Sequence, residues 1–217
     1  MKVFKKLAVI AALAAAMAPA MADVISLDFE GVGNLAAINE FYNGGTDSQG
    51  NSGPNYHVSF APGGALGVID SDKGGSFNGN AFSGKTAMIF LDNAAVLNYA
   101  AGFDTGFSFR FATPYYDGQV SVYSGLDKTG TLLGSIYLPI NGPGSGPGGP
   151  YSNWSIGSLG FAGTAMSIDF GGTANYIAYD DVTFGSITPG VPEPSTYALM
   201  ALGLAGIVLV TRRRRSA

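Results

Sequence analysis

Residues 105–111 read TGFSFRF, and this stretch decides the fold. Three phenylalanines, Phe107, Phe109 and Phe111, alternate with a small, a polar or a charged residue. Successive side chains of a β-strand point to opposite faces, so this alternation predicts a strand with one face in the core. An amphipathic helix would group apolar residues at positions i, i+3 and i+4, and apolar residues at every second position do not fit that pattern.

The same two-residue alternation recurs through most of the chain. Clusters of Gly, Asn, Asp, Ser and Pro separate the apolar runs, and these residues favour turns. Eight to ten short strands at this spacing predict an all-β fold, an antiparallel β-sandwich of the jelly-roll kind. Residues 94–101 read as at most a turn or two of helix. The runs that predict strands are 24–29, 105–111, 119–123, 132–138, 166–170 and 176–184.

The two ends of the chain differ in composition from this β-rich part. Three lysines in the first six residues precede an apolar run and an Ala-Met-Ala sequence at 20–22. That is the pattern of a cleavable secretory signal peptide. At the other end, the uncharged run 198–210 gives a helix of about 20 Å, shorter than the roughly 30 Å of bilayer hydrocarbon. Four arginines follow it at once.

These observations predict one folded domain between two targeting segments. The body is long enough to bury a substantial core, and the loops 43–54 and 142–150 interrupt it without dividing it. The predicted parts are a signal peptide (1–22), a β-sandwich domain (23–185), a linker with a Pro-Glu-Pro motif (186–196), a short transmembrane helix (197–211) and a basic cytoplasmic tail (212–217).

The charge of the chain is unevenly distributed. The whole chain has 11 Lys and Arg, 15 Asp and Glu, and a formal net charge of −4. Seven of the cations lie in the two targeting segments, so the body alone has a net charge of about −10. A surface this acidic repels phosphate backbones, which excludes nucleic acid as an expected partner. The chain has no cysteine, and a disulfide framework is therefore excluded.

A P-loop-like sequence occurs in the body without the context that the motif requires. Residues 79–86, GNAFSGKT, match the expression G-x-x-x-x-G-K-[ST]. Phosphate binding by a P-loop needs a strand before the loop and a helix after it. Here a strand-like run, MIFLD at 88–92, follows almost directly. We therefore expect that this segment does not bind a nucleotide.

Other catalytic patterns are also missing from the sequence. His57 is the only histidine, it reads as an ordinary strand residue, and no G-x-S-x-G nucleophile motif occurs. A carboxylate pair for glycoside hydrolysis remains open, because the body has 14 acidic residues. We therefore expect no enzymatic activity, with an exported polysaccharide hydrolase as the alternative.

Two acidic pairs lie near the ends of the body. Asp28 and Glu30 lie at the end of the first predicted strand, and Asp180 and Asp181 lie in the last one. Asp180 has the phase of the core-facing residues, where a lone carboxylate is costly unless it is paired or bound to a metal.

This arrangement resembles carbohydrate-binding jelly rolls, in which an early F-E and a late D-D-V approach each other and hold a structural calcium ion. The resemblance implies a calcium site with Glu30 and Asp180 as its principal ligands and Asp28 and Asp181 beside them. Oxygen ligands suit Ca²⁺. The alternative is that these acids lie at strand edges in water.

Aromatic residues in loops offer candidate platforms for sugar rings. Tyr115 and Tyr116 follow Pro114, and Tyr151 and Trp154 follow the Gly-Pro-rich loop. Their flat apolar faces and polar edges match the two sides of a sugar. The alternative is that these rings pack in the core or within the loops, as most of the aromatic residues in a sandwich do.

The C-terminal segment resembles the PEP-CTERM sorting signal of Gram-negative bacteria. A Pro-Glu-Pro motif, an apolar helix and a basic cluster occur there in that order. The resemblance implies processing by an exosortase, transient anchoring in the inner membrane, and delivery to the cell surface or extracellular matrix. The residues that carry it are Pro192, Glu193, Pro194, Arg212, Arg213, Arg214 and Arg215.

The body is similar to a group of PEP-CTERM proteins of undetermined activity. The shared stretches are DFEG, FYNGGT, AAGFDTGFSF, VSVYSGLDKTGTLL and YIAYDDVTFGS. Two classes of function are compatible with this resemblance. The first is a non-catalytic surface or biofilm-matrix protein that adheres to exopolysaccharide, and the second is a hydrolase that acts on it.

Overall fold

The structure is a computed structural model that describes residues 24–92, 95–145 and 148–188. The predicted signal peptide, transmembrane helix and basic tail lie outside these residues, as does the Pro-Glu-Pro motif. Within the described ranges, no helix is both long enough and apolar enough to cross a membrane.

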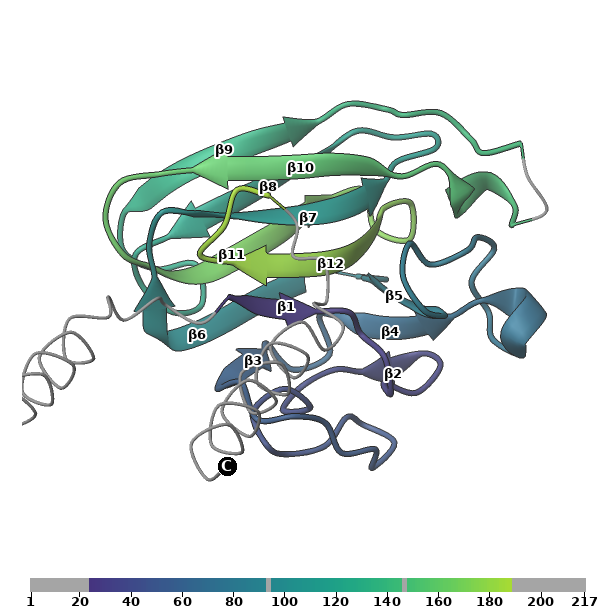
Figure 1. The fold of residues 1–217 in the computed structure, drawn as a ribbon, viewed down its shortest axis with the longest axis horizontal. Coiled ribbons are helices and arrows are strands. Elements are labelled where there is room, and N and C mark those ends of the chain that lie inside the picture. The colour runs from purple at the N-terminus through teal and green to yellow at the C-terminus, as the bar shows by residue number, and fades with distance from the viewer. Residues whose placement is uncertain (1–23, 93–94, 146–147, 189–217) are drawn as a thin grey trace, which may run out of the picture.

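Two antiparallel sheets pack face to face (Figure 1). The larger has the order β10-β7-β12-β5-β4-β2, with β1 also paired to β12, and the smaller has the order β3-β6-β11-β8-β9. The larger sheet contains β1 (Ile25–Leu27), β2 (Ala36–Ala37), β4 (Leu66–Ile69), β5 (Thr86–Ile89), β7 (Gly106–Ala112), β10 (Ser155–Gly160) and β12 (Ala178–Phe184). The smaller contains β3 (Val58–Phe60), β6 (Ala95–Phe103), β8 (Gly118–Tyr123), β9 (Leu132–Leu138) and β11 (Ala165–Gly172).

The prediction of an all-β jelly-roll sandwich is confirmed. From β5 onward the chain changes sheet at every connection except the β8–β9 hairpin. The described residues form twelve strands, more than the eight to ten expected, because two- and three-residue strands are too short to show a periodicity. The helical reading of residues 94–101 is wrong, since β6 runs through that region as a strand paired with β3 and β11.

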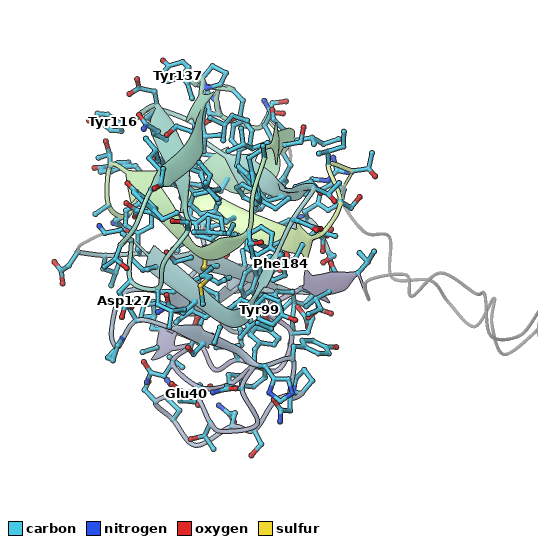
Figure 2. All side chains as sticks on the ribbon, turned by 90° about the vertical axis from the view of Figure 1, so that its left-hand side faces the viewer. Glu40, Tyr99, Tyr116, Asp127, Tyr137 and Phe184 are labelled. Carbon is cyan, nitrogen blue, oxygen red and sulfur yellow. The ribbon has the colours of Figure 1, made fainter. Side chains whose placement is uncertain are left out.

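Residues 105–111 form a core strand, as their alternation predicts. Phe107, Phe109 and Phe111 on β7 are buried in the core between the sheets. The Phe109 ring packs against Phe170 of the smaller sheet at a centroid distance of 5.9 Å. Figure 2 shows Tyr99 and Phe184 facing each other across the same interior, with their rings stacked at 6.0 Å. Aromatic pairs from both sheets therefore hold the two layers together.

The larger sheet is also covered on its outer face. A second apolar cluster lies there, separate from the main core. Two segments from outside the sheet, residues 70–85 and 148–154, contribute Phe77, Tyr151 and Trp154 to this cover. The fully buried members contributed by the sheet are Val68, Ala87, Ile89, Ala112 and Ala178.

A β-bulge in β12 changes the direction of its acidic residues. Asp181 has a φ of +47°, and the register against β7 shifts between Asp180 and Thr183. Tyr179 and Val182 therefore both lie in the main core, although they are three residues apart. The sequence analysis predicted that Asp180 and Val182 share the core-facing side of the strand. This prediction is wrong, because the bulge places them on opposite faces. Asp180 is buried, but it lies beneath the outer cover, on the side of Ala178.

Candidate functional site

Glu30 anchors the segment that resembles a P-loop. One carboxylate oxygen, Oε1, accepts hydrogen bonds from the backbone N–H groups of Lys85 (2.8 Å) and Thr86 (2.7 Å). A β-carbon at Gly84, where φ is +59°, would collide with this carboxylate. Strand β5 begins at Thr86, so a strand follows the segment where a P-loop has a helix. The geometry of a phosphate-binding loop is not formed here.

Asp180 and Asp181 hold the same segment from the other side. The N–H of Ser83 donates to Asp180 Oδ2 at 3.0 Å, and the Ser83 hydroxyl donates to Asp181 Oδ1 at 2.7 Å. Asp180 Oδ1 accepts the N–H of Asp181 at 2.8 Å. Burial raises the pKa of Asp180 to about 8, because its charged form has lost water. Burial also raises the pKa of Asp181.

Arg110 and two aromatic rings complete this arrangement. Arg110 lies opposite Asp180 in the β7–β12 register, and its guanidinium lies 4.0 Å from the centre of the Phe82 ring. Trp154 meets Phe82 edge-on, and its indole N–H donates to the carbonyl of Asn80 at 2.8 Å. These contacts fasten residues 80–86 onto the outer face of the larger sheet.

Three of the four predicted calcium ligands, Glu30, Asp180 and Asp181, bond to this one segment, and each of the four acids has at least one oxygen that accepts a hydrogen bond. Asp28 Oδ1 accepts the N–H of Glu30 at 3.1 Å, and the other three acids accept N–H or O–H donors as described above. In the part of the chain that the structure describes, no group of three acidic, His or Cys side chains is placed to hold a metal ion. Calcium binding by these acids stays a prediction.

A groove of about 530 Å³ lies on the outer cover of the larger sheet. We call it the tyrosine groove. None of its described lining residues is charged. Its lining includes Tyr115, Tyr151, Asn175 and Tyr176.

The tyrosines of this groove are fixed in different ways. Burial raises the pKa of Tyr151 to about 12, and its hydroxyl donates to the carbonyl of Asn175 at 3.0 Å. Asn175 has a φ of +64°, and its N–H donates to the carbonyl of Phe90, which fixes the turn before β12. Tyr115 and Tyr176 expose 50% and 38% of their surface, so their rings are available to a ligand.

The structure brings together three of the four predicted sugar platforms. Tyr115 and Tyr151 line the tyrosine groove, and Tyr116 packs against Tyr176 at 4.6 Å between ring centres. Trp154 is absent from the described lining of this groove. The sequence analysis missed Tyr176, because its alternation with Ala178 assigned it to the last strand, although β12 begins only at Ala178.

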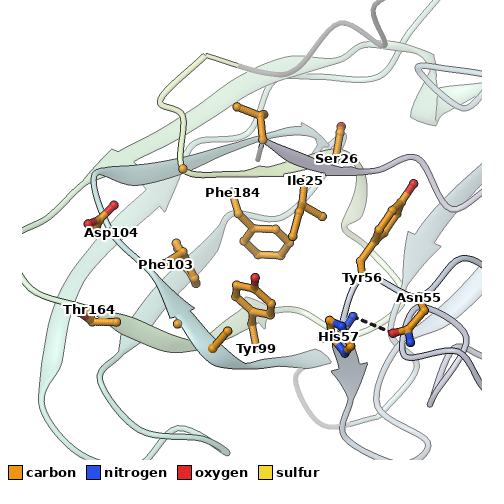
Figure 3. Close-up of a pocket in the computed structure, with 14 residues that line it drawn as sticks. Ile25, Ser26, Asn55, Tyr56, His57, Tyr99, Phe103, Asp104, Thr164 and Phe184 are labelled. Carbon is orange, nitrogen blue, oxygen red and sulfur yellow. Dashed lines mark hydrogen bonds between the residues drawn. The ribbon is translucent and has the colours of Figure 1, made fainter. Parts of the chain in front are cut away.

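A second groove, of about 810 Å³, lies at the other end of β12 (Figure 3). We call it the β1 groove. Tyr99, Phe103 and Phe184 lie in its middle, with Asp104 and Thr164 on one side and Tyr56 and His57 on the other. No sequence pattern indicates this groove, because its walls come from segments far apart in the chain.

His57 lies at the edge of this groove, and the interpretation of it as an ordinary strand residue is wrong. It precedes β3, is exposed, and has a φ of +59°. The backbone N–H of His57 donates to the side-chain oxygen of Asn55 at 3.1 Å, and this bond holds the turn. The adjacent Tyr56 stacks almost parallel on the buried Tyr42.

Comparison with protein families identifies the C-terminal segment. A model described as the PEP-CTERM protein-sorting motif matches residues 190–215. The chain carries a PEP-CTERM sorting motif. The motif implies export and transit through a membrane, and it includes the Pro-Glu-Pro and arginine residues named from the sequence. No curated protein sequence matches the chain.

Several solved structures are similar to part of the chain. A family 6 carbohydrate-binding module from Clostridium stercorarium in complex with cellobiose has 18% identity, 59% coverage of this chain and 86% of its own, and a TM-score of 0.38. A β-1,3-glucan-binding module of the same family from Bacillus halodurans has 18% identity, 58% and 89% coverage, and a TM-score of 0.37. The K1 cleaved adhesin domain of Lys-gingipain from Porphyromonas gingivalis has 12% identity, 75% and 98% coverage, and a TM-score of 0.43.

Proposed function

We propose that this protein is an exported, non-catalytic glycan-binding protein. After processing by an exosortase and release from transient inner-membrane anchoring, it adheres to exopolysaccharide at the cell surface or in the biofilm matrix. The observation that carries the binding function is the tyrosine groove. The sorting motif supplies the route by which the groove reaches polysaccharide.

The chemistry of the tyrosine groove suits a neutral sugar. The exposed faces of Tyr115 and Tyr176 match the C–H face of a sugar ring, and Asn175 and the tyrosine hydroxyls supply polar groups at its edge. The groove is uncharged in its described lining, and the body is strongly acidic, so anionic polymers are disfavoured. Trp154 packs edge-on against Phe82 and is not part of the proposed binding site.

The non-catalytic assignment rests on the carboxylates. Glycoside hydrolysis uses two carboxyl groups that flank the scissile bond. Among the described lining residues, the tyrosine groove has no carboxylate and the β1 groove has only Asp104. Asp180 and Asp181 are adjacent, but both are buried and occupied by Ser83.

Binding to an array of neutral oligosaccharides tests the proposal, with the full chain kept in mild detergent. We expect retention by at least one glycan, no release of reducing ends, and roughly tenfold weaker binding for Tyr115→Ala or Tyr176→Ala. Tyr137→Ala is the matched control, because Tyr137 is 63% exposed and is absent from the described lining of both grooves. Equal binding by Tyr115→Ala and Tyr137→Ala would remove the tyrosine groove as the site, and release of reducing ends would favour the hydrolase.

A further inference from the structure

The β1 groove has an aromatic floor that is held rigidly. Tyr99 stacks on Phe184 with an angle of 23° between the ring planes, and Phe103 packs on Phe184 at 5.1 Å. Phe103 and Phe184 are almost fully buried and belong to the core, so they support the half-buried Tyr99, which is the most exposed ring of this floor. A preformed apolar surface of this kind reduces the ordering cost of binding.

A second platform stands at the side of this floor. Tyr56 is 38% exposed, and its ring lies 6.1 Å from the Tyr42 ring at an angle of 11°. Tyr42 is buried, so the stacking fixes the position of Tyr56. The neighbouring left-handed turn at His57 is held by the Asn55 side chain.

The rim of the groove is polar and carries little charge. Ser26, Asn55, His57 and Thr164 surround the aromatic floor, and the only carboxylate in the described lining is Asp104. Hydroxyl, amide and imidazole groups both donate and accept hydrogen bonds, as sugar hydroxyls require. The described lining contains no lysine or arginine, so an anionic ligand would lack a counter-charge. This combination favours a neutral saccharide over phosphate or an acidic sugar.

The two grooves lie at the two ends of the same strand, β12. Asn175 and Tyr176, just before β12, line the tyrosine groove, and Phe184, its last residue, lines the β1 groove. A seven-residue strand spans roughly 20 Å, so the two grooves lie at opposite ends of the sandwich. One molecule could therefore hold two separate glycan chains at once.

We propose that the β1 groove is a second site for a neutral saccharide unit, and that the protein cross-links two polysaccharide chains. The cross-linking rests on the proposed function, because the first chain is held in the tyrosine groove. The ligand class of the β1 groove is argued independently, from Tyr56, Tyr99 and the polar rim.

The test measures binding stoichiometry with the full chain in mild detergent. The probe is the best-retained sugar from a panel of neutral gluco-, galacto-, manno- and xylo-trisaccharides, titrated by calorimetry. We expect two equivalents for the unchanged protein and for the control Tyr137→Ala. We expect one equivalent for Tyr56→Ala, and one for Ala101→Trp, which fills the β1 groove from an exposed position in its lining.

The outcomes separate the two proposals. Suppose that the unchanged protein binds one equivalent, that Tyr115→Ala abolishes this binding and that Ala101→Trp does not affect it. This result would overturn the second site and keep the proposed function. One equivalent with the reverse behaviour would support the β1 groove and overturn the tyrosine groove. No binding by the unchanged protein would overturn both.

A second readout tests the bridging itself. The protein should raise the light scattering of the matching polysaccharide, excess trisaccharide should reverse this, and each single-groove variant should lose it. Scattering that persists in Ala101→Trp would contradict cross-linking through the β1 groove.

Discussion

Replacing Glu30 with alanine should destabilise the fold, because one oxygen of this side chain holds two backbone donors. The donors are the N–H groups of Lys85 and Thr86, at 2.8 Å and 2.7 Å. Thr86 is fully buried and begins β5, which pairs with β4 and β12 inside the larger sheet. The substitution would leave its N–H without this acceptor at the start of a buried strand.

The magnitude follows from the two bonds. A hydrogen bond to a charged group contributes about 1.5–3 kcal/mol, and the partial exposure of Glu30 reduces this through solvent screening. We therefore expect Glu30→Ala to lower the free energy of unfolding by about 2–4 kcal/mol. At about 2–4 °C per kcal/mol, the melting temperature should fall by roughly 5–15 °C. Glu30→Gln keeps an acceptor oxygen and should lose about half as much.

Urea unfolding followed by Trp154 fluorescence measures this difference in the presence of a chelator. Glu40→Ala is the matched control, because Glu40 is an exposed glutamate that accepts one side-chain bond, from Asn43. Its loss should stay within about 0.5 kcal/mol. If Glu30→Ala lost no more stability than Glu40→Ala, Glu30 would not be the anchor of β5.

Three further predictions concern the folded body. If Glu30 and Asp180 share a calcium ion, a chelator should lower the melting temperature, and Glu30→Gln should abolish this dependence on calcium. Identical melting curves with and without chelator would refute the calcium site. Because burial raises the pKa of Asp180 from 3.8 to about 8, the folded state keeps a proton that the unfolded chain releases. In chelator, the free energy of unfolding should therefore fall as the pH rises from about 4 to about 8, and a rise over that range in urea titrations would contradict the burial of this acid. The 23–190 fragment should fold alone as a β-rich monomer, and a far-ultraviolet circular dichroism spectrum dominated by helix would refute this.

The sequence predicted the strands that show alternation and missed the positions where local geometry interrupts it. Residues 105–111 alternate cleanly, and they form a core strand. The sequence does not reveal the bulge at Asp181: an aspartate tolerates the left-handed φ of +47°, but an Asp-Asp pair in an alternating run does not by itself mark a bulge. Residues 94–101 are rich in alanine, which favours helix, but pairing with β3 and β11 on both sides overrides that propensity.

The candidate sites were predictable only in part, for a similar reason. Tyr115, Tyr116 and Tyr151 stood out because they follow turn residues, which place side chains on the surface. Trp154 had the same sequence context, yet it packs on Phe82 instead. The β1 groove combines the first strand, the 55–57 turn, the β6–β7 connection and the end of β12. No local pattern records that meeting of distant segments.

The C-terminal motif gives the most direct test of the whole account, which requires the protein to leave the membrane and associate with polysaccharide. An uncleaved apolar run with four cytoplasmic arginines would keep the body on the inner membrane. The measurement is the intact mass of the protein recovered from the extracellular polysaccharide of cells that have the sorting enzyme. We predict a mass that lacks the segment from about Pro194 onward, and a larger, membrane-retained species when Pro192, Glu193 and Pro194 are changed to alanine. A mass that still includes Arg212 to Arg215, or no protein in the polysaccharide fraction, would contradict the account.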